Sequence, residues 1–386
     1  MLKAIPVEEI LSAQGVIIDV RSESEFAEAH VPGAIGISLF SDGERAEVGT
    51  LYKKSGPESA RVRGLEIVKP KLSTFWIAFE GLFKELKLNQ PGDEILKQAF
   101  AIVADRLMHE TPTDDVASLI VQNPKVHERE LIFYCWRGGA RSRSMAMLAQ
   151  LLGFNSRVVT GGHKAFRAYV QNYLDAPEYP FKICTLYGLT GAAKTQILQQ
   201  WQVEGKPIID LEALAFHRGS AFGQLGFAER GRQKDFENNL FWQMQKLAAR
   251  GEKFIVVEGE SQRIGYCQLP NRFMEAMLDG IHVKVDRSLE ERVEHIIDHY
   301  VKPFKEEAVM QEAVRALDAI KRKLGSEKHK ELALILAQKN YSDFTRELLV
   351  NYYDKLYGLS RAPDDFYHLV INGASDWEKI AVLLNG

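Results

Sequence analysis

Short apolar runs alternate with longer segments of helical spacing along the whole chain. The runs that predict buried strands are 15–20, 34–37, 131–134, 181–188, 207–211, 253–258 and 366–371. Because strands that alternate with helical segments pair into parallel sheets covered by helices, this pattern predicts an α/β fold in both halves of the chain.

Two long segments break the alternation and predict helices alone. Between residues 61 and 126, apolar side chains that include Phe75 and Trp76 recur at helical spacing, which predicts a helical insertion. Residues 288–357 are charged and helical in pattern, with Pro303 as the main break. They predict a helical C-terminal region, to which the pattern assigns no role.

A domain boundary is predicted at 175–180, where two prolines stand among polar residues after a helical pattern. The length of 386 residues suits two or three domains. The predicted domains are residues 1–175, with the insertion at about 61–126, and residues 181–386. We therefore expect an N-terminal α/β domain with a helical insertion, followed by a second α/β domain with a helical C-terminal region.

Overall composition excludes several classes of protein. Hydrophobic residues make up 46% and charged residues 26%, as in ordinary globular proteins. The formal net charge of −3 excludes a chain that is basic throughout, so any nucleic-acid binding must use a local patch. The three cysteines are too few and too scattered for a disulfide framework or a four-ligand zinc site. With an acidic N-terminal segment and no run of about 18 apolar residues, the protein is expected in the cytoplasm, neither exported nor membrane-spanning.

A cysteine stands in a loop between a predicted strand and a predicted helix, in the segment Tyr134-Cys-Trp-Arg-Gly-Gly-Ala-Arg-Ser142. Gly138 and Gly139 allow such a loop to turn its backbone N–H groups inward, and the N-terminus of the following helix adds positive potential. This setting favours a thiolate at Cys135.

Charged neighbours strengthen that interpretation. Arg137 and Arg141 lie close to Cys135 in the sequence and could hold an anion beside the thiolate. We predict these three residues as catalytic, although a buried cysteine at a strand end is the ordinary alternative. Cys184, within an apolar strand, and Cys267, in a loop without basic neighbours, are predicted to be structural.

The stretch 131–174 contains no Asp or Glu, which suits an anion or a nucleic-acid backbone, although a solvated basic face has the same appearance. The candidate nucleic-acid-binding residues in and after the cysteine loop are Arg143, Arg157, Lys164 and Arg167. A second basic group consists of Arg230, Arg232 and Lys234. Trp136 could stack on a base or pack against the insertion.

Residues 1–170 resemble the rhodanese family of sulfurtransferases in three motifs. These are Asp19-Val-Arg-Ser-Glu-Ser-Glu-Phe26 with Ala29-His-Val-Pro-Gly-Ala34, the cysteine loop, and Val158-Val-Thr-Gly-Gly-His-Lys-Ala-Phe166. One departure is that the loop arginine stands six residues after the cysteine, so the loop is one residue longer than the family's usual C-x-x-G-x-R-S. The C-x5-R spacing also resembles cysteine phosphatases and arsenate reductases, although a general acid is missing from the motif.

A phosphate-binding loop is predicted at 188–195, between a strand-like run and a helical run. Gly188, Lys194 and Thr195 fit the Walker A pattern, but Ala193 replaces the glycine expected before the lysine. We expect diphosphate binding more than fast nucleotide hydrolysis, because the methyl group restricts the backbone. The predicted phosphate-binding residues of the loop are Gly188, Thr190, Gly191, Lys194 and Thr195, and Thr195 could reach a Mg²⁺ ion.

Two further segments, 209–223 and 256–265, place acids at the ends of predicted strands. Asp210 and either Glu258 or Glu260 could orient a metal or a proton. The residues of these segments that could meet anions are His217, Arg218 and Arg263. Each of them could equally be a helix cap, a surface pair or a solvated charge.

The order of these four motifs resembles the bacterial tRNA 2-selenouridine synthases across nearly the whole chain. The segments that carry the resemblance are the rhodanese-like module, the phosphate loop, D-L-E-x-L-A-x-H-R-G-S-x-F-G, and E-x-E-S-x-x-I-G. The family's usual phosphate loop reads G-L-T-G-S-G-K-T, so Ala192 and Ala193 replace Ser and Gly here.

The resemblance implies a transferase that converts 2-thiouridine at the tRNA wobble position to 2-selenouridine, in the tRNAs for Lys, Glu and Gln. The sulfur is first geranylated with geranyl diphosphate and then replaced by selenium from selenophosphate. It implies no tightly bound cofactor, no membrane, tRNA as partner, and selenophosphate synthetase as a candidate partner. Cys135 would attack the selenium of selenophosphate or carry it as a selenopersulfide, with Gly138 and Gly139 in the loop that holds the phosphate.

Two alternatives remain open from the sequence. One is a rhodanese-fold cysteine phosphatase or sulfurtransferase with a nucleotide-binding regulatory domain, and turnover of a generic aryl phosphate through Cys135 would favour the phosphatase. A non-catalytic binding or sulfur-relay protein would load Cys135 only once per chain.

Overall fold

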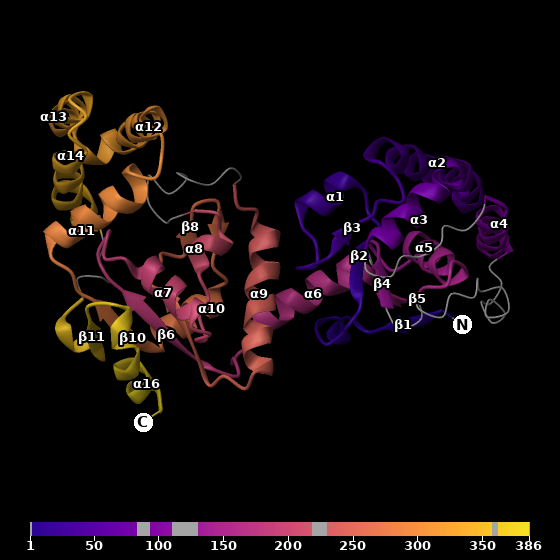
Figure 1. The fold of residues 1–386 in the computed structure, drawn as a ribbon, viewed down its shortest axis with the longest axis horizontal. Coiled ribbons are helices and arrows are strands. Elements are labelled where there is room, and N and C mark those ends of the chain that lie inside the picture. Colours follow the sequence, from indigo (N-terminus) through magenta and orange to yellow (C-terminus); the bar gives the residue numbers. More distant parts are fainter. Residues whose placement is uncertain (1, 83–92, 110–129, 218–229, 357–361, 386) are drawn as a thin grey trace. The chain divides into compact units, whose positions relative to one another are not determined.

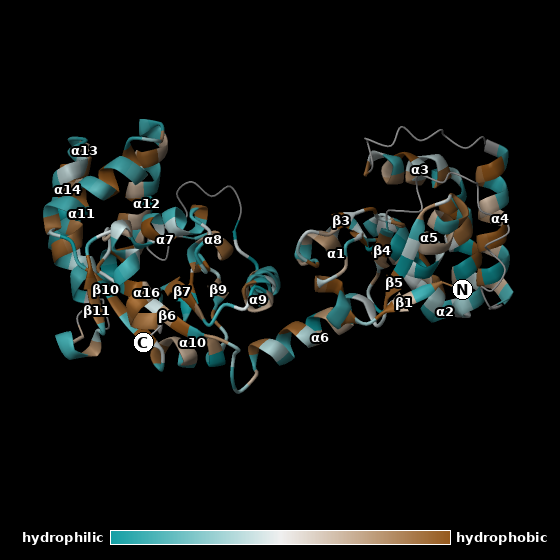
Figure 2. Cartoon of the chain, turned by 60° about the horizontal axis from the view of Figure 1, so that its bottom comes forward, coloured by the Kyte–Doolittle hydropathy of each residue, from teal (hydrophilic) through white to brown (hydrophobic). Residues whose placement is uncertain are grey.

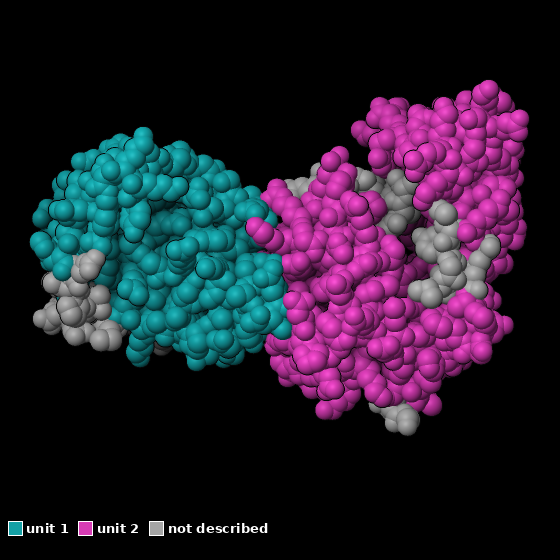
Figure 3. Space-filling model, turned by 180° about the vertical axis from the view of Figure 1, so that it is seen from behind, with its two compact units in different colours: residues 1–172 teal, residues 173–386 magenta. Residues whose placement is uncertain are grey.

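The computed structural model describes residues 2–82, 93–109, 130–217, 230–356 and 362–385. It divides into two compact units, Met1–Asn172 and Tyr173–Gly386, which Figure 3 shows in two colours. Each unit is built on its own parallel sheet (Figure 1), so the predicted α/β class is confirmed in both.

The sheet of the first unit has five parallel strands in the order β1-β5-β4-β2-β3. Its strands are β1 (Lys3–Ile5), β2 (Val16–Asp19), β3 (Ile35–Gly36), β4 (Glu130–Tyr134) and β5 (Asn155–Val159). The long apolar strand β4 lies at the centre, which places the residue that follows it at the middle of the sheet's carboxyl edge.

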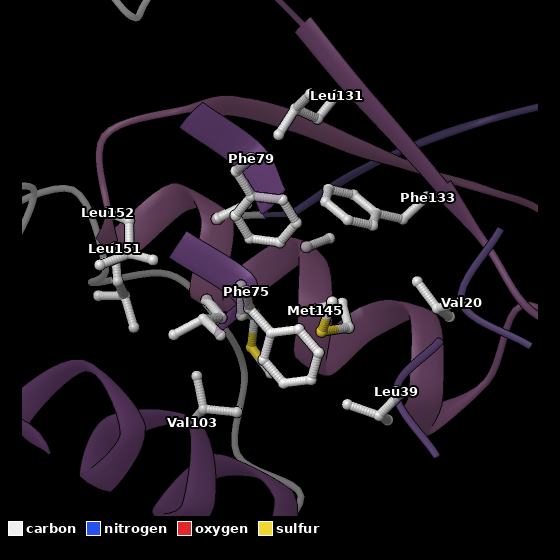
Figure 4. Close-up of a cluster of buried hydrophobic side chains, with 14 of the residues drawn as sticks. Val20, Leu39, Phe75, Phe79, Val103, Leu131, Phe133, Met145, Leu151 and Leu152 are labelled. Carbon is white, nitrogen blue, oxygen red and sulfur yellow. The ribbon is translucent and has the colours of Figure 1, made fainter. Parts of the chain in front are cut away.

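Helices cover both faces of this sheet. They are α1 (Glu23–Glu28), α2 (Asp42–Val68), α3 (Leu72–Gly81), α4 (Asp93–His109), α5 (Ala140–Leu151) and α6 (Gly162–Leu174). Alternate residues of β4 point to opposite faces: Phe133 packs in the core with helices α3, α4 and α5, and Tyr134 stacks on His163 of α6. Figure 4 shows Phe75 and Phe79 pointing into the same core as Phe133 and Met145, so the predicted apolar face of the insertion is buried.

The helical insertion begins earlier than the predicted residue 61. Helix α2 starts at Asp42, where Ser41 and Glu44 form a capping box, and it kinks at Gly56, just before Pro57. The sequence pattern misses the first part of α2 because this part is exposed and polar and lacks the apolar spacing that marks α3. The predicted end of the insertion, residue 126, lies outside the described residues.

The second unit has a four-stranded parallel sheet in the order β11-β10-β6-β7. Its strands are β6 (Lys182–Tyr187), β7 (Phe254–Glu258), β10 (Ile281–Val285) and β11 (Leu369–Ile371), and β8 (Arg263–Ile264) and β9 (Cys267–Gln268) form a separate hairpin. Figure 2 shows hydrophobic colour along β6, β7 and β10, as expected for strands covered on both faces.

Five helices surround the second sheet. They are α7 (Lys194–Val203), α8 (Leu211–Leu214), α9 (Gln233–Ala249), α10 (Asn271–Leu278) and α16 (Trp377–Asn385). Trp201 of α7 meets Trp377 of α16 edge to face at 5.1 Å, and both helices pack on the face of β6 that carries Leu186. On the opposite face, Thr185 donates a hydrogen bond of 3.3 Å to Met277 O at the end of α10.

Residues 288–356 form a helical lobe with its own hydrophobic core, so the predicted helical region 288–357 is confirmed over its described residues. Its elements are α11 (Leu289–Ile296), α12 (Glu306–Leu324), α13 (Ser326–Ala337), α14 (Tyr341–Leu348), α15 (Asp354–Leu356) and the π-helical turns Ile297–Val301 and Leu349–Tyr353. The chain breaks near the predicted Pro303 and also at Gly325 and Asn340. No helix among the described residues is both long enough and apolar enough to cross a membrane.

Two predicted strands need correction. In 207–211 only Ile208 makes a bridge, to Val256, and α8 begins at Leu211 because Asp210 caps it. The run 366–371 pairs only from Leu369, since residues Asp364–Phe366 form a 3-10 turn. The other predicted strands are confirmed with bounds shifted by one or two residues, and β1, β5, β8, β9 and β10 were not predicted.

Candidate functional site

Cys135 lies at the carboxyl end of the central strand β4, in the loop that leads into α5. Its side chain is 3% exposed, so the loop holds it inward. The start of α6 fixes the loop backbone: His163 N donates to Cys135 O at 2.8 Å, and Lys164 N donates to Trp136 O at 2.9 Å. The cysteine loop therefore packs against the segment that carries the third rhodanese-like motif.

The Cys135 sulfur lies next to a polar side chain, that of Ser142. The Ser142 hydroxyl lies 3.3 Å from Cys135 Sγ and 3.2 Å from Gly139 O, and it is fully buried at the first turn of α5. The hydroxyl has one proton, so it donates either to the Cys135 sulfur or to Gly139 O. Sequence analysis did not predict a role for Ser142. Its position seven residues after Cys135, at the start of a predicted helix, was the one signal that could have found it.

Gly162 allows the α6 segment to approach the cysteine loop. Its φ of +59° lies in the left-handed region, and a Cβ at this position would lie 2.3 Å from Cys135 O and 2.6 Å from Gly138 N. The approach leaves no room for any side chain, so Gly162 sets the distance between the two segments.

We predict that Gly162→Ala destabilises the first unit by about 3–5 kcal/mol, because the methyl group adds a steric clash to the strain of a positive φ. Gly33→Ala is the matched control: Gly33 also has a positive φ, +81°, but a Cβ at Gly33 would have no atom within 4 Å. It should cost only about 1–2 kcal/mol. Urea unfolding measures both, and equal losses would contradict a clash at the cysteine loop.

The two predicted anion-binding arginines differ in their surroundings. Arg137 is exposed. Arg141 is half-buried and donates to Glu25 at 2.9 Å, and Arg45 reaches the same carboxylate at 2.9 Å. Burial is the largest single effect and raises the pKa of Glu25, but the charge and hydrogen bond of Arg141, together with Ser22 and Arg45, outweigh it and lower the pKa. An anion at the cysteine loop must therefore compete with Glu25 for Arg141.

Two of the four predicted nucleic-acid-binding residues are not exposed. Arg157 of β5 forms an ion pair with Glu130 of β4, just outside the acid-free stretch, and Arg167 is buried. Arg143 and Lys164 are exposed. The expected basic patch is thus smaller than predicted, because Arg157 is paired with Glu130 and Arg167 is buried.

Other candidates for nucleic-acid contact are exposed. Trp136 is 39% exposed, and its ring lies 5.8 Å from that of His163 rather than against the insertion. In the second unit, Arg230, Arg232 and Lys234 are all exposed, and the Arg230 guanidinium lies 4.8 Å from the centre of the Tyr266 ring.

Cys184 and Cys267 are buried, and Cys267 belongs to strand β9 rather than to a loop. Burial raises the pKa of the Cys184 thiol to about 12 and that of Cys267 to about 11. Both stay protonated at neutral pH and are poor nucleophiles, in keeping with the predicted structural role.

The predicted phosphate loop connects β6 to α7, at the carboxyl edge of the second sheet. Gly191 has a φ of +84°, and its Cα is so close to Arg292 O that a Cβ would lie at 2.9 Å. Ala193 also has a positive φ, +65°, where a Walker A loop has glycine. Ala193 therefore adopts the left-handed conformation in spite of its methyl group, at a cost of about 1–2 kcal/mol.

The loop's polar side chains surround its N–H groups. Lys194 Nζ donates to Gly188 O at 3.0 Å, and Thr195 Oγ1 donates to Glu212 Oε2 at 2.8 Å. The Thr190 hydroxyl is buried and has no hydrogen-bond partner among the described residues. An ammonium, a hydroxyl and the N-terminus of α7 at one loop suit a phosphate group.

Acids line the edge of the sheet next to this loop. Asp210 caps α8 by accepting from Ala213 N at 2.8 Å, and Glu258 accepts from Glu212 N at 2.6 Å. Burial, then the charges of Asp210 and Glu212, raises the pKa of Glu258 well above its ordinary value. Burial also raises the pKa of Glu260. Glu212 was missed by sequence analysis, although it follows Asp210 by two residues at the same strand end.

The pKa of Glu212 predicts how stability depends on pH. Burial, and then the charge of Glu260, raises it from 4.5 to about 8. Between these values the native state holds a proton that the unfolded state releases, so the free energy of unfolding falls as pH rises from about 5 to about 8. Glu212→Gln keeps an acceptor for Thr195 and stays neutral.

We therefore expect Glu212→Gln to flatten this fall and to be more stable than the unsubstituted protein above pH 8, by an amount on the order of a few kcal/mol. Urea unfolding between pH 5 and pH 9 measures it. Glu378→Gln, at an exposed position of α16, is the control and should leave the slope unchanged. A slope that Glu212→Gln does not alter would show that Glu212 is already charged in the native state.

Two of the remaining predicted residues, His217 and Arg263, contact the Gly265 turn. His217 packs against Gly265, whose Cβ would lie 2.5 Å from the imidazole, and burial lowers the pKa of His217. Arg263 is exposed and donates to Gly265 O at 3.1 Å, within its own hairpin. Arg218 lies outside the described residues. The second pair of family-like motifs therefore meets at Gly265.

A pocket with a cavity volume of about 120 Å³ joins the phosphate loop to the helical lobe. Its polar end is formed by the loop from Thr190 to Thr195 with Glu212 and Glu260. Its other walls come from α11, α12, α14 and the two π-helical turns.

The helical lobe is tied to the phosphate loop by a buried side chain, Arg292 of α11. Arg292 Nε donates to Thr190 O at 2.9 Å, and its Nη2 donates to Asp354 Oδ1 at 2.7 Å. The guanidinium is thus held from two sides, and it fixes α11 and α15 beside the loop.

Models of known protein families match this chain in both of its units. The family model described as "tRNA 2-selenouridine synthase AAA domain" matches residues 181–379, and the rhodanese-like domain model matches residues 6–63. The rhodanese match ends before the cysteine loop, so the placement of Cys135 depends on the geometry above.

Three curated relatives carry the name tRNA 2-selenouridine synthase. The protein of Nitrosomonas europaea is 32% identical over 286 residues, which is 74% of this chain and 63% of the relative, just under two thirds. That of Pseudomonas fluorescens is 30% identical and covers 92% of this chain and 90% of the relative. That of Shewanella frigidimarina is 28% identical, with 92% of each chain covered.

Proposed function

The chain belongs to the tRNA 2-selenouridine synthase family, and from this premise we propose that it is the transferase that replaces the sulfur of 2-thiouridine in tRNA by selenium. The observation that carries the proposal is the pair of strand-to-helix loops, one at Cys135 and one at Lys194, at the carboxyl edges of two sheets. Two anionic substrates, selenophosphate and geranyl diphosphate, suit two such loops.

The phosphate loop serves the first step in this proposal. The thiocarbonyl sulfur attacks C1 of geranyl diphosphate, the C–O bond breaks, and the diphosphate leaves with the electron pair. Lys194, Thr195 and the N-terminus of α7 stabilise the charge that develops on that leaving group. Alkylation turns a poor leaving sulfur into a thiolate leaving group, which prepares the base for substitution.

Cys135 serves the second step. Its thiolate cleaves the P–Se bond of selenophosphate by attack at phosphorus; selenium leaves with both electrons as hydroselenide, and the phosphoryl group passes to water. Hydroselenide adds at C2 of the base and displaces geranylthiolate. Attack at selenium, the expectation from sequence, would need either an oxidant or the release of phosphite, so electron balance favours attack at phosphorus.

Mg²⁺ fits the donors at the phosphate loop. The Thr195 hydroxyl and the Glu212 carboxylate are hard oxygen ligands 2.8 Å apart, and the buried Glu258 Oε2 atom has no hydrogen-bond partner among the described residues. The described residues include no group of three side chains that could hold a metal by themselves. Thr195 and Glu212 would therefore hold the ion together with phosphate oxygens, as is usual for Mg²⁺, and the ion would neutralise diphosphate charge.

For tRNA, the exposed residues Arg143, Lys164 and Trp136 beside the cysteine loop are the proposed contacts, and Arg230, Arg232 and Lys234 are a second group. Phosphate contacts by these side chains make binding depend on salt. Wobble 2-thiouridine in the tRNAs for Lys, Glu and Gln is the proposed substrate, selenophosphate synthetase the proposed supplier of selenium, and the cytoplasm the proposed location.

The experiment that tests this function uses a 2-thiouridine anticodon stem-loop and reads nucleoside masses. Geranyl diphosphate alone should give the S-geranyl nucleoside, and later addition of selenophosphate should give 2-selenouridine. If neither mass appears and Cys135 turns over an aryl phosphate instead, the chain is a cysteine phosphatase. Loading of Cys135 only once per chain would indicate a relay protein.

A further inference from the structure

The pocket at the phosphate loop changes character along its length. Beyond Lys194 and Thr195, the lining passes to Val309 and Ala313 of α12 and to Phe344 and Leu348 of α14. These four side chains are at least nine-tenths buried, so they form a wall and not an exposed surface. One pocket therefore joins a phosphate-binding end to an apolar compartment.

The helical lobe that forms the apolar compartment is attached to the phosphate loop. Arg292 of α11 binds the loop carbonyl of Thr190 and the carboxylate of Asp354 in α15, so a buried side chain attaches the helical lobe directly to the phosphate loop. A ligand that spans both ends meets a site whose two halves are already aligned.

Two buried hydroxyls in the pocket wall also indicate a ligand. Thr190 Oγ1 at the loop and the Tyr341 hydroxyl at the start of α14 have no hydrogen-bond partner among the described residues. Buried hydroxyls without partners are costly, and a bound phosphate oxygen or an ordered water would satisfy them.

From this arrangement we infer that the C-terminal helical lobe binds the apolar chain of the prenyl diphosphate, and that α12 and α14 set the chain length the enzyme accepts. The inference rests on the proposed function, and it gives a role to residues 288–357. The diphosphate lies at Lys194 and Thr195, and the branched chain extends between Val309, Ala313 and Phe344.

Ala313→Leu tests the inference by filling the compartment from one wall. Titration calorimetry with geranyl diphosphate, dimethylallyl diphosphate and inorganic diphosphate measures both ends of the pocket. We expect the affinity for geranyl diphosphate to fall at least about tenfold, as is usual when hydrophobic fit is lost. The affinity for inorganic diphosphate should stay within about twofold, and the preference for geranyl over dimethylallyl should disappear.

Ala319→Leu is the matched control, because Ala319 lies on the exposed face of the same helix α12. It should leave all three affinities unchanged. Val309→Ala makes the opposite change and enlarges the compartment, so it should raise the affinity for farnesyl relative to geranyl diphosphate. This second variant keeps the test valid if Ala313→Leu does not fold.

The outcomes separate this inference from the proposed function. If the unsubstituted protein binds no geranyl diphosphate, the proposed function fails at its first step, and the inference fails with it. If the protein binds geranyl diphosphate but Ala313→Leu and Val309→Ala leave the chain-length preference unchanged, the helical lobe does not hold the chain and only the inference is overturned.

Discussion

Cys135→Ser should lower the incorporation of selenium into a 2-thiouridine stem-loop by at least about a thousandfold, because a serine hydroxyl stays protonated at neutral pH and is a far weaker nucleophile than a thiolate. The substitution is nearly isosteric, and it leaves the backbone bonds from His163 and Lys164 to the loop in place. Loss of activity would therefore report on chemistry rather than on folding.

Geranylation should survive Cys135→Ser, since we place that step in the second unit. The S-geranyl nucleoside should then accumulate when both co-substrates are present, which mass spectrometry detects directly. Cys184→Ala and Cys267→Ala are the controls, because both thiols are buried and protonated, and both variants should keep selenation. Loss of both activities in Cys135→Ser would contradict the assignment of one step to each loop.

The fold class was predictable because the central strands are continuous apolar runs. The runs at β4, β6 and β7 are covered on both faces and contain few polar residues, so their composition is unambiguous. Strand β10 was missed because His282 and Lys284 alternate with its apolar residues. Strand β5 was missed because Ser156 and Arg157 occupy its centre.

Tertiary contacts explain why β5 tolerates these polar residues. The Ser156 hydroxyl donates to Ala146 O at 2.7 Å, and Arg157 pairs with Glu130 on the neighbouring strand. A polar residue inside a parallel sheet is stable when its partner comes from another element. Local hydrophobic patterning carries no information on such partners, so strands of this kind escape it.

The two loops of the site could be located from sequence, because each is a local strand-to-helix motif. The electrostatic surroundings of the two loops could not be predicted from the sequence. Arg141 appears as a free positive charge in an acid-free stretch, yet it binds Glu25, which lies 116 positions earlier. Glu212 and Arg292 escaped notice for the same reason, since their roles depend on Thr195 and Thr190 across the fold.

Lys194→Ala should weaken the binding of geranyl diphosphate by about 10- to 100-fold, which corresponds to the roughly 1.5–3 kcal/mol of a hydrogen bond to a charged group. The ammonium now donates to Gly188 O at 3.0 Å, within the loop where the phosphate would bind. Its charge also lowers the pKa values of Glu212 and Glu260 against the effect of burial. Without Lys194, two carboxyl groups would face the diphosphate with no cation among them.

Titration calorimetry with geranyl diphosphate measures the loss, and a stem-loop that already carries the S-geranyl group separates the two steps. Lys194→Ala should convert that pre-geranylated RNA to 2-selenouridine at the normal rate, because Cys135 and its loop belong to the other unit. Lys182→Ala, an exposed lysine at the start of β6, is the control and should bind geranyl diphosphate normally. Unchanged affinity in Lys194→Ala would remove the phosphate loop from the geranylation site, and the pocket beneath the helical lobe would then need a different ligand.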